Sequence, residues 1–385
     1  MVFSVNKIPP LDLTQQYKLI AEEVTASVQA VLASGRYIGG AEVERFENSF
    51  GEYIGVSDCI GCNSGTDALF LALRAFDIGP GSEVIVPVFT FIATAEVVSM
   101  VGATPVFVDI EANTFNLDVQ KIEAAITSKT KAIIPVHLFG QSVNMTKLME
   151  IARTHNLIVI EDCAQATGAT WKGEKVGAIG DIGCFSFFPT KNLGACGDGG
   201  ALTTNDRAIA SKIRMIKDHG QSSKYNSAVV GINSRLDALQ AAILNIKLRY
   251  LDQWNLQRSR IAKRYHEFLG AVPNLIISEE MSSGQSVWNQ YTVRVRQHPS
   301  KQDAALIVDR NVVRTQLQEQ GISTMLYYPV PLHLQPVYGD LGYQPGQFPV
   351  AEQLCEEVLS LPMFPELTTV QQDCVIDEIK EILSK

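Results

Sequence analysis

Four apolar residues run directly into two acidic residues in Leu157-Ile158-Val159-Ile160-Glu161-Asp162. A short run rich in β-branched residues is typical of a buried strand in a parallel sheet. Three similar runs precede it, at residues 84–88, 106–109 and 132–136, and helical patterns lie between the runs, for example over 91–101 and 145–155. This alternation predicts βαβ units, and therefore an α/β fold with a mostly parallel central sheet flanked by helices.

The pattern changes after this region. Residues 183–188 and 201–204 have the composition of strands and flank the glycine-rich stretch 194–200. We expect these two strands to form a hairpin or a crossover beside the sheet. Residues 235–269 carry apolar positions at helical spacing, which predicts a long helix that connects two domains.

The rest of the chain mixes a strand candidate at 291–295 with helix candidates at 303–320 and 368–384. This mixture predicts a smaller α+β domain at the C-terminus. We therefore expect a large domain over residues 12–250 and a small domain over 251–385.

Composition and charge exclude several classes of protein. The 385 residues are 46% hydrophobic and 19% charged, as in ordinary globular proteins, and the net charge of -9 lacks the basic character that nucleic-acid binding requires. The sequence lacks both an apolar run of about 20 residues and the pattern of a signal peptide at residues 1–13. We expect a cytoplasmic protein with no membrane span and no nucleic-acid partner.

Seven cysteines, an odd number in mostly apolar surroundings, indicate free thiols in a reducing compartment. Cys59 and Cys62 form a CxxC pair, but it has no second pair and no nearby histidine. We therefore favour a structural role for this pair over a zinc or redox site.

Two stretches predict helix N-termini that carry polar donors. In Asn63-Ser64-Gly65-Thr66-Asp67, which precedes the helical run 68–75, unpaired amides and the helix dipole would suit a phosphate group. The stretch 231–237 offers a second cluster of this kind. Ordinary N-capping explains either stretch as well.

Polar side chains follow the buried strand that ends the opening stretch. Asp162 and Gln165 fall at its carboxyl end, the edge at which such sheets bind ligands. A carboxylate beside a pyridine nitrogen would keep that nitrogen positively charged and make the ring an electron sink. A helix cap or a structural ion pair is the alternative interpretation.

Lys191 follows the largely aromatic stretch 185–189 and precedes the glycine-rich stretch. Partial burial lowers the pKa of an amine, as a lysine that forms a Schiff base requires. A phosphate-binding loop is excluded, because in that motif the glycines precede the lysine. Ser186 is placed to supply a hydroxyl group to a phosphate.

Phosphate donors, a partner for a pyridine nitrogen and an amine in apolar surroundings are together what pyridoxal phosphate requires. The residues offer no comparable set for other chemistry. The six histidines show no HExxH spacing, and no serine stands in a GxSxG turn. We therefore expect pyridoxal 5'-phosphate as the cofactor and no metal ion.

These residues resemble the DegT-type nucleotide-sugar aminotransferases, which are pyridoxal phosphate enzymes of fold type I in the aspartate aminotransferase superfamily. The resemblance runs from about Pro10 to Leu383, with family-like order and spacing. It rests on the stretches 64–69, 161–165, 186–201, 231–237, 328–335 and 359–365.

The resemblance implies a role for each matching residue. Lys191 would form a Schiff base with the cofactor and shuttle a proton between the amino acid and the cofactor. Asp162 would hold the pyridine nitrogen, Gln165 would bond to the ring hydroxyl group, and Phe91 would stack on the ring.

The same resemblance assigns the phosphate to Gly65, Thr66 and Ser186. Asn233 matches a residue that reaches the phosphate from the neighbouring subunit. A homodimer with two shared active sites is therefore implied.

The substrate class also follows from the resemblance. The stretches 137–141 and 329–338 are most similar to aminotransferases that act on a 3-oxo sugar linked to a nucleoside diphosphate, with L-glutamate as donor. We expect a dTDP-3-oxo-6-deoxyhexose, with Tyr328 and His333 in contact with the substrate. A 4-oxo sugar and a UDP-3-oxo-uronate remain alternatives.

Two further alternatives concern the kind of activity. Family members that are sugar dehydratases have histidine at the position of Lys191, which disfavours that reaction here. A regulatory protein that binds pyridoxal phosphate without turnover is the non-enzymatic alternative.

Overall fold

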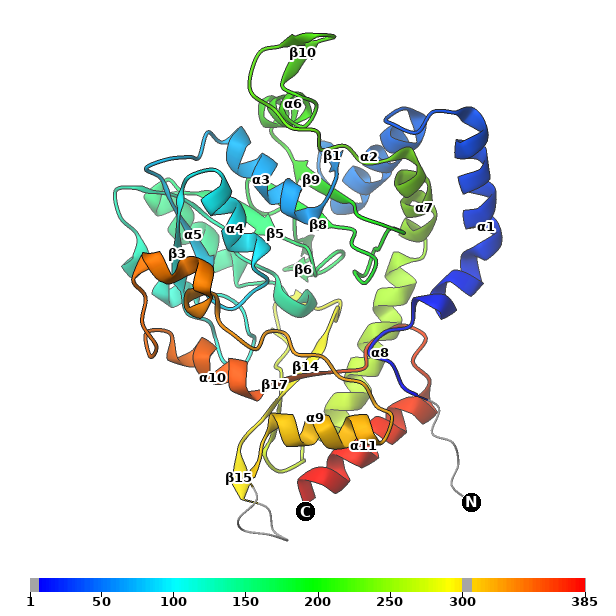
Figure 1. Ribbon diagram of the computed structural model, residues 1–385, viewed down its shortest axis with the longest axis vertical. Helices are drawn as coiled ribbons and strands as arrows, with labels where there is room; N and C mark the ends of the chain where they lie inside the picture. Colours follow the sequence, from blue (N-terminus) through cyan, green and yellow to red (C-terminus); the bar gives the residue numbers. More distant parts are fainter. Residues whose placement is uncertain (1–6, 300–306, 385) are drawn as a thin grey trace.

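The computed structural model describes residues 7–299 and 307–384 (Figure 1). A sheet of seven strands forms the centre of the larger part of the molecule, in the order β1-β9-β8-β5-β4-β2-β3. Its strands are β1 (Asp58–Cys62), β2 (Glu83–Pro87), β3 (Thr104–Val108), β4 (Thr130–Ile133), β5 (Ile158–Asp162), β8 (Ile182–Ser186) and β9 (Gly200–Thr204).

The sheet is mostly parallel, as predicted. The neighbours from β3 to β8 pair in parallel, whereas β9 runs antiparallel to both β8 and β1. Since β1 is antiparallel to β9, it points in the same direction as β8. The carboxyl ends of six strands therefore meet at one edge, and the predicted α/β fold class is confirmed.

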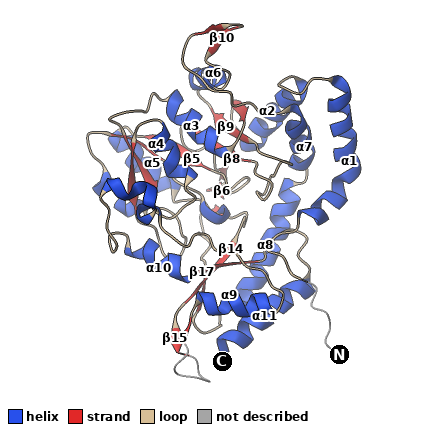
Figure 2. Cartoon of the chain, in the orientation of Figure 1, coloured by secondary structure: helices blue, strands red, loops and turns tan. Residues whose placement is uncertain are grey.

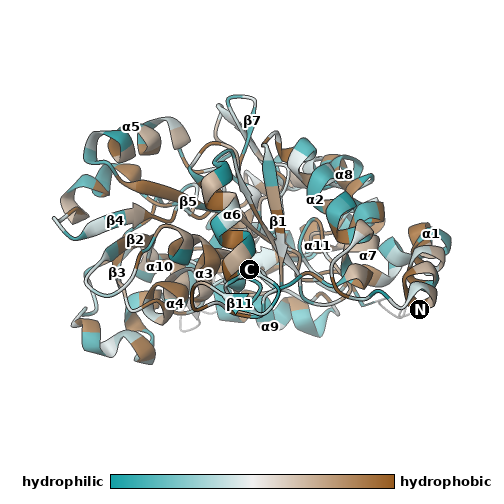
Figure 3. Cartoon of the chain, turned by 90° about the horizontal axis from the view of Figure 1, so that it is seen from above, coloured by the Kyte–Doolittle hydropathy of each residue, from teal (hydrophilic) through white to brown (hydrophobic). Residues whose placement is uncertain are grey.

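Successive residues of a strand point to opposite faces, so buried strands need apolar residues at every position. In β2, Val84 and Val86 pack into the hydrophobic cluster that contains α3 (Gly65–Ala75), while Ile85 packs into the cluster that contains α5 (Met145–His155). Helices on both faces explain the continuous apolar runs in the sequence. In Figure 3 the helix α5 mixes hydrophobic and hydrophilic residues.

The strands predicted over 183–188 and 201–204 pair with each other antiparallel, as expected of a hairpin, but they lie inside the sheet and not beside it, which corrects their predicted place. Gly183 is the reason that β8 fits there, because a Cβ atom at this position would lie 2.4 Å from Gly177 Cα. The strand β8 pairs with β5 on one side and β9 on the other. It therefore extends the edge at which the predicted site residues lie.

The helix expected over 235–269 is two helices, α7 (Ala238–Leu248) and α8 (Leu251–Leu269). The break falls at two residues that bind the same carboxylate on α1 (Leu13–Ser34). Tyr250 donates a hydrogen bond to Glu23 at 2.6 Å, and Arg249 forms an ion pair with it. Figure 1 shows α1 along the outer side of the molecule, next to α7.

A second sheet lies in the C-terminal part, as the predicted α+β domain requires. It is antiparallel, with the order β12 (Leu275–Ile277), β14 (Tyr291–Val295) and β17 (Val358–Leu361). Helices α8, α9 (Arg310–Glu319) and α11 (Thr369–Ser384) contribute to its hydrophobic cluster. The helix expected over 303–320 begins at Arg310, and residues 303–306 lie outside the described residues.

We propose the division into a large domain (12–250) and a small domain (251–385), because the separate cluster around the second sheet is built almost wholly from residues beyond Leu251. One segment of the small domain packs against the larger one. Leu332, Tyr338 and Leu354 belong to the cluster of the central sheet. This segment brings the neighbouring residues of the C-terminal part close to the edge where the strands end.

The remaining elements are short or peripheral (Figure 2). The helices are α2 (Ala41–Ile54), α4 (Ala93–Met100), α6 (Arg207–Ile216) and α10 (Pro349–Glu357), with 3-10 turns η1 (Val119–Lys121), η2 (Glu123–Ala125), η3 (Leu138–Gly140), η4 (Leu332–Leu334) and η5 (Pro336–Leu341). The strands are β6 (Thr170–Trp171), β7 (Glu174–Lys175), β10 (Gln221–Ser223), β11 (Asn226–Ser227), β13 (Gly284–Gln285), β15 (His298–Pro299) and β16 (Ile307–Val308). Over the described ranges, none of the helices combines the length and apolar character needed to cross a bilayer.

Candidate active site

A cavity of about 470 Å³ lies at the carboxyl ends of the strands, where the parallel sheet is expected to bind ligands. Eight of the ten predicted site residues line it: Gly65, Thr66, Phe91, Asp162, Gln165, Ser186, Lys191 and Tyr328. They come from segments that are more than 250 residues apart in the sequence. The fold therefore gathers nearly the whole predicted site in one place.

The N-terminus of α3 forms one wall of the cavity. Ser64 is its N-cap and accepts a hydrogen bond from the amide of Asp67, so the capping interpretation is correct for this residue. The amides of Gly65 and Thr66 have no partner within the helix and remain available to an anion. A Cβ atom on residue 65 would lie 2.6 Å from Ser186 Cβ. Glycine at this position therefore allows the end of the helix and the Ser186 hydroxyl to lie close together at one anion-binding site.

Asp162 ends β5 and is held in place by its backbone and its side chain. Its amide donates to Pro135 O at 2.9 Å and its carbonyl accepts from the amide of His137 at 3.1 Å. One carboxylate oxygen accepts from the amide of Ala164 at 3.1 Å and the other from the hydroxyl of Thr94 at 2.9 Å. Burial raises the pKa of Asp162, whereas these two donors and the charge of Lys191 lower it.

Gln165 is oriented by the backbone of a neighbouring turn. Its Oε1 accepts a hydrogen bond from the amide of Phe139 at 2.7 Å, so its Nε2 must be the atom that faces the cavity. Nε2 donates to the hydroxyl of Tyr328 at 3.2 Å. The site therefore presents an amide donor, which suits an acceptor such as a ring hydroxylate.

Lys191 reaches the cavity from a turn that is fixed by a buried amide network. The side chain of the next residue, Asn192, donates to Asn255 Oδ1 at 2.7 Å and to Val287 O at 2.8 Å, and accepts from Asn289 at 2.8 Å. These contacts tie the lysine-bearing turn to the C-terminal part of the chain. Burial lowers the pKa of Lys191 to about 8, against the opposing charge of Asp162.

We expect this lowered pKa to be measurable in the apoprotein. The fraction of free amine at Lys191 should reach one half near pH 8, whereas ordinary lysines titrate near pH 10.4. Competitive acetylation at a series of pH values, followed by peptide mass spectrometry, measures this midpoint. A midpoint above about pH 10 would contradict the burial that we describe for this amine.

Phe91 lies between β2 and α4 and is 56% exposed, although it is a large apolar residue. Its ring centroid is 6.3 Å from that of Tyr328 across the cavity. An exposed aromatic face beside this cavity suits a planar ring that would cover it.

Two of the predicted residues lie outside the cavity of their own chain. Asn233 is exposed and precedes α7. His333 is buried, its Nε2 forms a hydrogen bond with Glu352 at 3.1 Å, and its ring packs against that of Phe348. The structure thus gives His333 a packing role and does not bring it to the other site residues.

Several cavity residues escaped the sequence analysis. Gln290, Leu326 and Tyr327 come from the C-terminal part of the chain, whose position relative to the sheet no local pattern reveals. Thr90 and Thr94 were detectable in principle, since two polar residues four positions apart in an apolar segment face the same side of a helix start.

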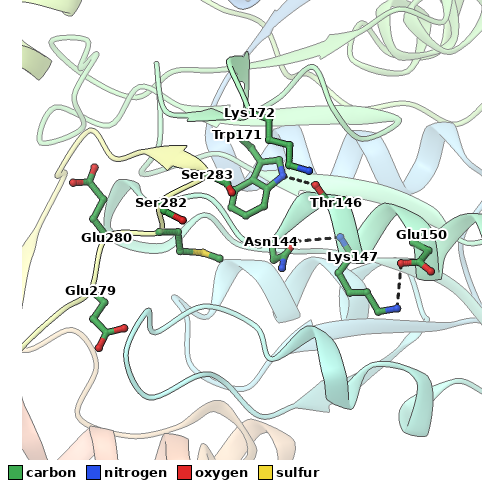
Figure 4. Close-up of a pocket in the computed structure, with 11 residues that line it drawn as sticks. Asn144, Thr146, Lys147, Glu150, Trp171, Lys172, Glu279, Glu280, Ser282 and Ser283 are labelled. Atoms are coloured by element: carbon green, nitrogen blue, oxygen red, sulfur yellow. Dashed lines mark hydrogen bonds and ion pairs between the residues drawn. The ribbon is translucent and has the colours of Figure 1, made fainter.

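A second, more open hollow of about 580 Å³ lies at the N-terminus of α5 (Figure 4). None of the predicted site residues lines it. Trp171 donates to the hydroxyl of Thr146 at 2.8 Å, and Lys147 pairs with Glu150 at 3.1 Å. These four side chains therefore already have partners within the hollow.

Among the described residues, one group has the composition of a metal site, His137, Glu161 and Cys163. Its polar atoms already have partners. His137 Nδ1 accepts from the amide of Val143, so Nε2 carries the proton and donates to Glu161 at 2.9 Å. Glu161 also accepts the amides of Ile179 and Gly180. This arrangement is a closed structural network.

The chain is similar to a known protein family over most of its length. The model of the DegT/DnrJ/EryC1/StrS aminotransferase family matches residues 18–380. The chain belongs to this family.

Three curated relatives cover nearly the whole chain. A pleiotropic regulatory protein of Geobacillus stearothermophilus is 47% identical over 97% of this chain and 98% of its own length. A dTDP-3-amino-3,4,6-trideoxy-alpha-D-glucose transaminase of Streptomyces venezuelae is 42% identical, with coverage of 97% and 96%. A UDP-N-acetyl-3-dehydro-alpha-D-glucosamine 3-aminotransferase of Acidithiobacillus ferrooxidans is 45% identical, with coverage of 94% and 95%.

Solved structures show the same fold. DesV of S. venezuelae, in complex with a ketimine intermediate, superposes with a TM-score of 0.94 at 42% identity, covering 98% of this chain and 99% of that one. NtdA of Bacillus subtilis, with bound cofactor PMP, gives a TM-score of 0.90 at 32% identity, covering 100% and 87%. The predicted family, fold type and class of enzyme, a pyridoxal-phosphate-dependent aminotransferase, are confirmed.

The residues of the cavity fit this cofactor. At Gly65 the lack of a Cβ atom lets the N-terminus of α3 approach Ser186, and the amides and hydroxyl there suit a phosphate. Asp162 offers a buried carboxylate to a ring nitrogen. Lys191 supplies the amine. This set of donors and charges matches what pyridoxal phosphate requires.

Proposed function

We propose that this aminotransferase moves an amino group from L-glutamate to a 3-oxo sugar linked to a nucleoside diphosphate. The observation that carries the proposal is a lysine of lowered pKa in the same cavity as Asp162 and the open N-terminus of α3. Two relatives are aminotransferases named for a 3-amino or 3-dehydro sugar, one linked to dTDP and one to UDP, which supports both the substrate class and the position.

We assign the cofactor contacts to residues of the cavity. The amides of Gly65 and Thr66 and the hydroxyl of Ser186 hold the phosphate. Asp162 faces the ring nitrogen, and Gln165 donates to the ring hydroxyl group through the amide that Phe139 orients toward the cavity.

When bound, pyridoxal phosphate supplies an electron-withdrawing ring that stabilises negative charge on the carbon bearing the amino group. Lys191 Nζ takes the proton from the α carbon of glutamate, and its lowered pKa leaves about a tenth of the amine unprotonated at pH 7, far more than in an ordinary lysine. In the second half of the reaction, Nζ returns a proton to the sugar carbon that receives the amine. Tyr328, whose pKa is raised by burial, stays protonated and orients the substrate from the opposite wall.

We also propose that the active unit is a homodimer. Asn233 is exposed and does not line the cavity of its own chain, which suits a contact with the phosphate in the partner's site. On α1, Leu19 is 70% exposed and Leu32 is 51% exposed. Large apolar side chains on one helix are typical of a surface that a second copy covers.

The cytoplasm is the compartment that we propose. All seven cysteines are free thiols, and five of them are buried. Reduced cysteines in this number are typical of a reducing compartment.

Two other substrates and one function without turnover are the alternatives to this proposal. A 4-oxo sugar and a UDP-3-oxo-uronate would use the same lysine and the same cofactor contacts. The name of the Geobacillus relative favours, as a second candidate, a regulatory protein that binds the cofactor without turnover.

One experiment separates these functions. We expect the cofactor-loaded protein to convert L-glutamate into 2-oxoglutarate in proportion to the active sites, with a change in cofactor absorbance. The starting form of the cofactor should then be regenerated when a 3-oxo sugar takes up the amino group, as tested with a panel of dTDP-linked and UDP-linked 3-oxo and 4-oxo sugars. An unchanged spectrum with glutamate would favour the regulatory protein, and regeneration by 4-oxo sugars alone would move the reaction to C4.

A further inference from the structure

Two buried threonines line the cavity beside Asp162. Thr90 follows β2 and is 3% exposed, and Thr94 belongs to α4 and is 1% exposed. Thr94 Oγ1 is 2.9 Å from Asp162 Oδ2, and Thr90 Oγ1 is 3.1 Å from Thr94 Oγ1. The three side chains form one continuous chain of hydrogen bonds.

The direction of these hydrogen bonds is fixed by the ionised carboxylate. A carboxylate only accepts, so the single proton of the Thr94 hydroxyl must point to Asp162. The oxygen of Thr94 then has no proton left for Thr90 and accepts one from it. Thr90 therefore orients Thr94, and Thr94 donates to Asp162.

The Thr94 hydroxyl is one of only two hydrogen-bond donors shown for the carboxylate of Asp162 among the described residues. Each oxygen of Asp162 has one protein donor, the amide of Ala164 on Oδ1 and the hydroxyl of Thr94 on Oδ2. Burial favours the neutral carboxylic acid, and these donors and the charge of Lys191 favour the ionised form. Removing one of two donors in a buried site has a large effect, since hydrogen bonds to a charged group are the strong ones.

We propose that Thr94, oriented by Thr90, is a positioning residue that controls the protonation of the cofactor's ring nitrogen through Asp162. This inference rests on the proposed contact between Asp162 and that nitrogen. It assigns a function to two residues that touch neither the amino donor nor the sugar in the reaction described above.

The chain offers closely matched variants. Thr94→Val keeps the shape and removes the hydroxyl, Thr94→Ser keeps the hydroxyl, and Thr90→Val removes only the residue that orients it. Thr292→Val is the control, because Thr292 is equally buried in β14 and its hydroxyl lies 2.8 Å from that of Ser360.

The test uses apoprotein reconstituted with pyridoxal phosphate that is ¹⁵N-labelled in the ring. The ¹⁵N chemical shift reports whether the ring nitrogen is protonated, and dialysis gives the dissociation constant of the cofactor. We expect Thr94→Val to shift the signal toward the neutral ring and to weaken cofactor binding about tenfold. Thr94→Ser should restore both values, Thr90→Val should change them less in the same direction, and Thr292→Val should leave both at the wild-type values.

The outcomes separate this inference from the function on which it rests. A neutral ring nitrogen in the wild-type protein would overturn the contact with Asp162, and with it the proposed site. A protonated nitrogen in the wild type that stays fully protonated in Thr94→Val would overturn the role of Thr94 alone. If Thr94→Val does not fold, Thr90→Val decides, and a wild-type spectrum for that variant would also contradict the inference.

Discussion

Replacing Lys191 with alanine is expected to lower kcat at least about 10³-fold, while the protein keeps its fold. The variant loses the group that takes the proton from the substrate carbon and the amine that holds the cofactor. Because alanine leaves space in the cavity, small primary amines added to the solution should restore part of the lost rate. Single-turnover rates with L-glutamate, with and without added amine, measure both effects.

Two controls make this result specific. Lys191→Arg keeps a positive charge but offers no free amine near neutral pH, so it should be as inactive as the alanine variant. Lys175→Met removes another partly buried lysine, whose pKa is also lowered by burial but which binds Tyr53 O outside the cavity. That variant should keep wild-type turnover, whereas wild-type turnover in Lys191→Ala would refute the assignment.

Asp162→Asn is expected to lower the rate of proton removal from glutamate about 10² to 10³-fold. The amide has nearly the shape of the carboxylate and keeps a hydrogen bond from Ala164, so the lost charge accounts for the effect. The same variant should change Lys191. Since the negative charge of Asp162 raises the pKa of the lysine, its removal should move the midpoint of acetylation below pH 8.

Asp109→Asn is the matched control for this prediction. Asp109 is also a buried carboxylate directly after a parallel strand, and it accepts the amides of Ile110 and Ala351. It pairs with Lys121 and does not line the cavity. The Asp109→Asn variant should be less stable but keep its affinity for the cofactor and its rate with glutamate. An equal loss of rate in both variants would contradict the role proposed for Asp162.

The sequence predicted best what depends on local patterns. The helix over 145–155 and the strand over 291–295 have the predicted bounds, because their apolar pattern is clear and polar residues flank them. Asp162, Gln165 and Lys191 were identifiable since a charged or polar residue after a buried strand must meet a partner at the sheet edge.

Long-range contacts were beyond these patterns. No local signal shows that β8 lies between β5 and β9, because that position depends on close packing at Gly183. The break between α7 and α8 falls at residues that contact Glu23, which is more than 200 residues away in the sequence. A histidine such as His333 is a residue type that often contacts substrates. Its contact with Glu352 depends on the tertiary fold, so the sequence alone does not reveal it.

The decisive measurement is borohydride reduction of the resting, cofactor-loaded protein, followed by peptide mapping with mass spectrometry. Reduction makes the bond between the cofactor and its lysine permanent. We expect one cofactor group per chain, located on the peptide that contains Lys191. A label on a different lysine, or no covalent label in a protein that retains the cofactor, would contradict the active site described above.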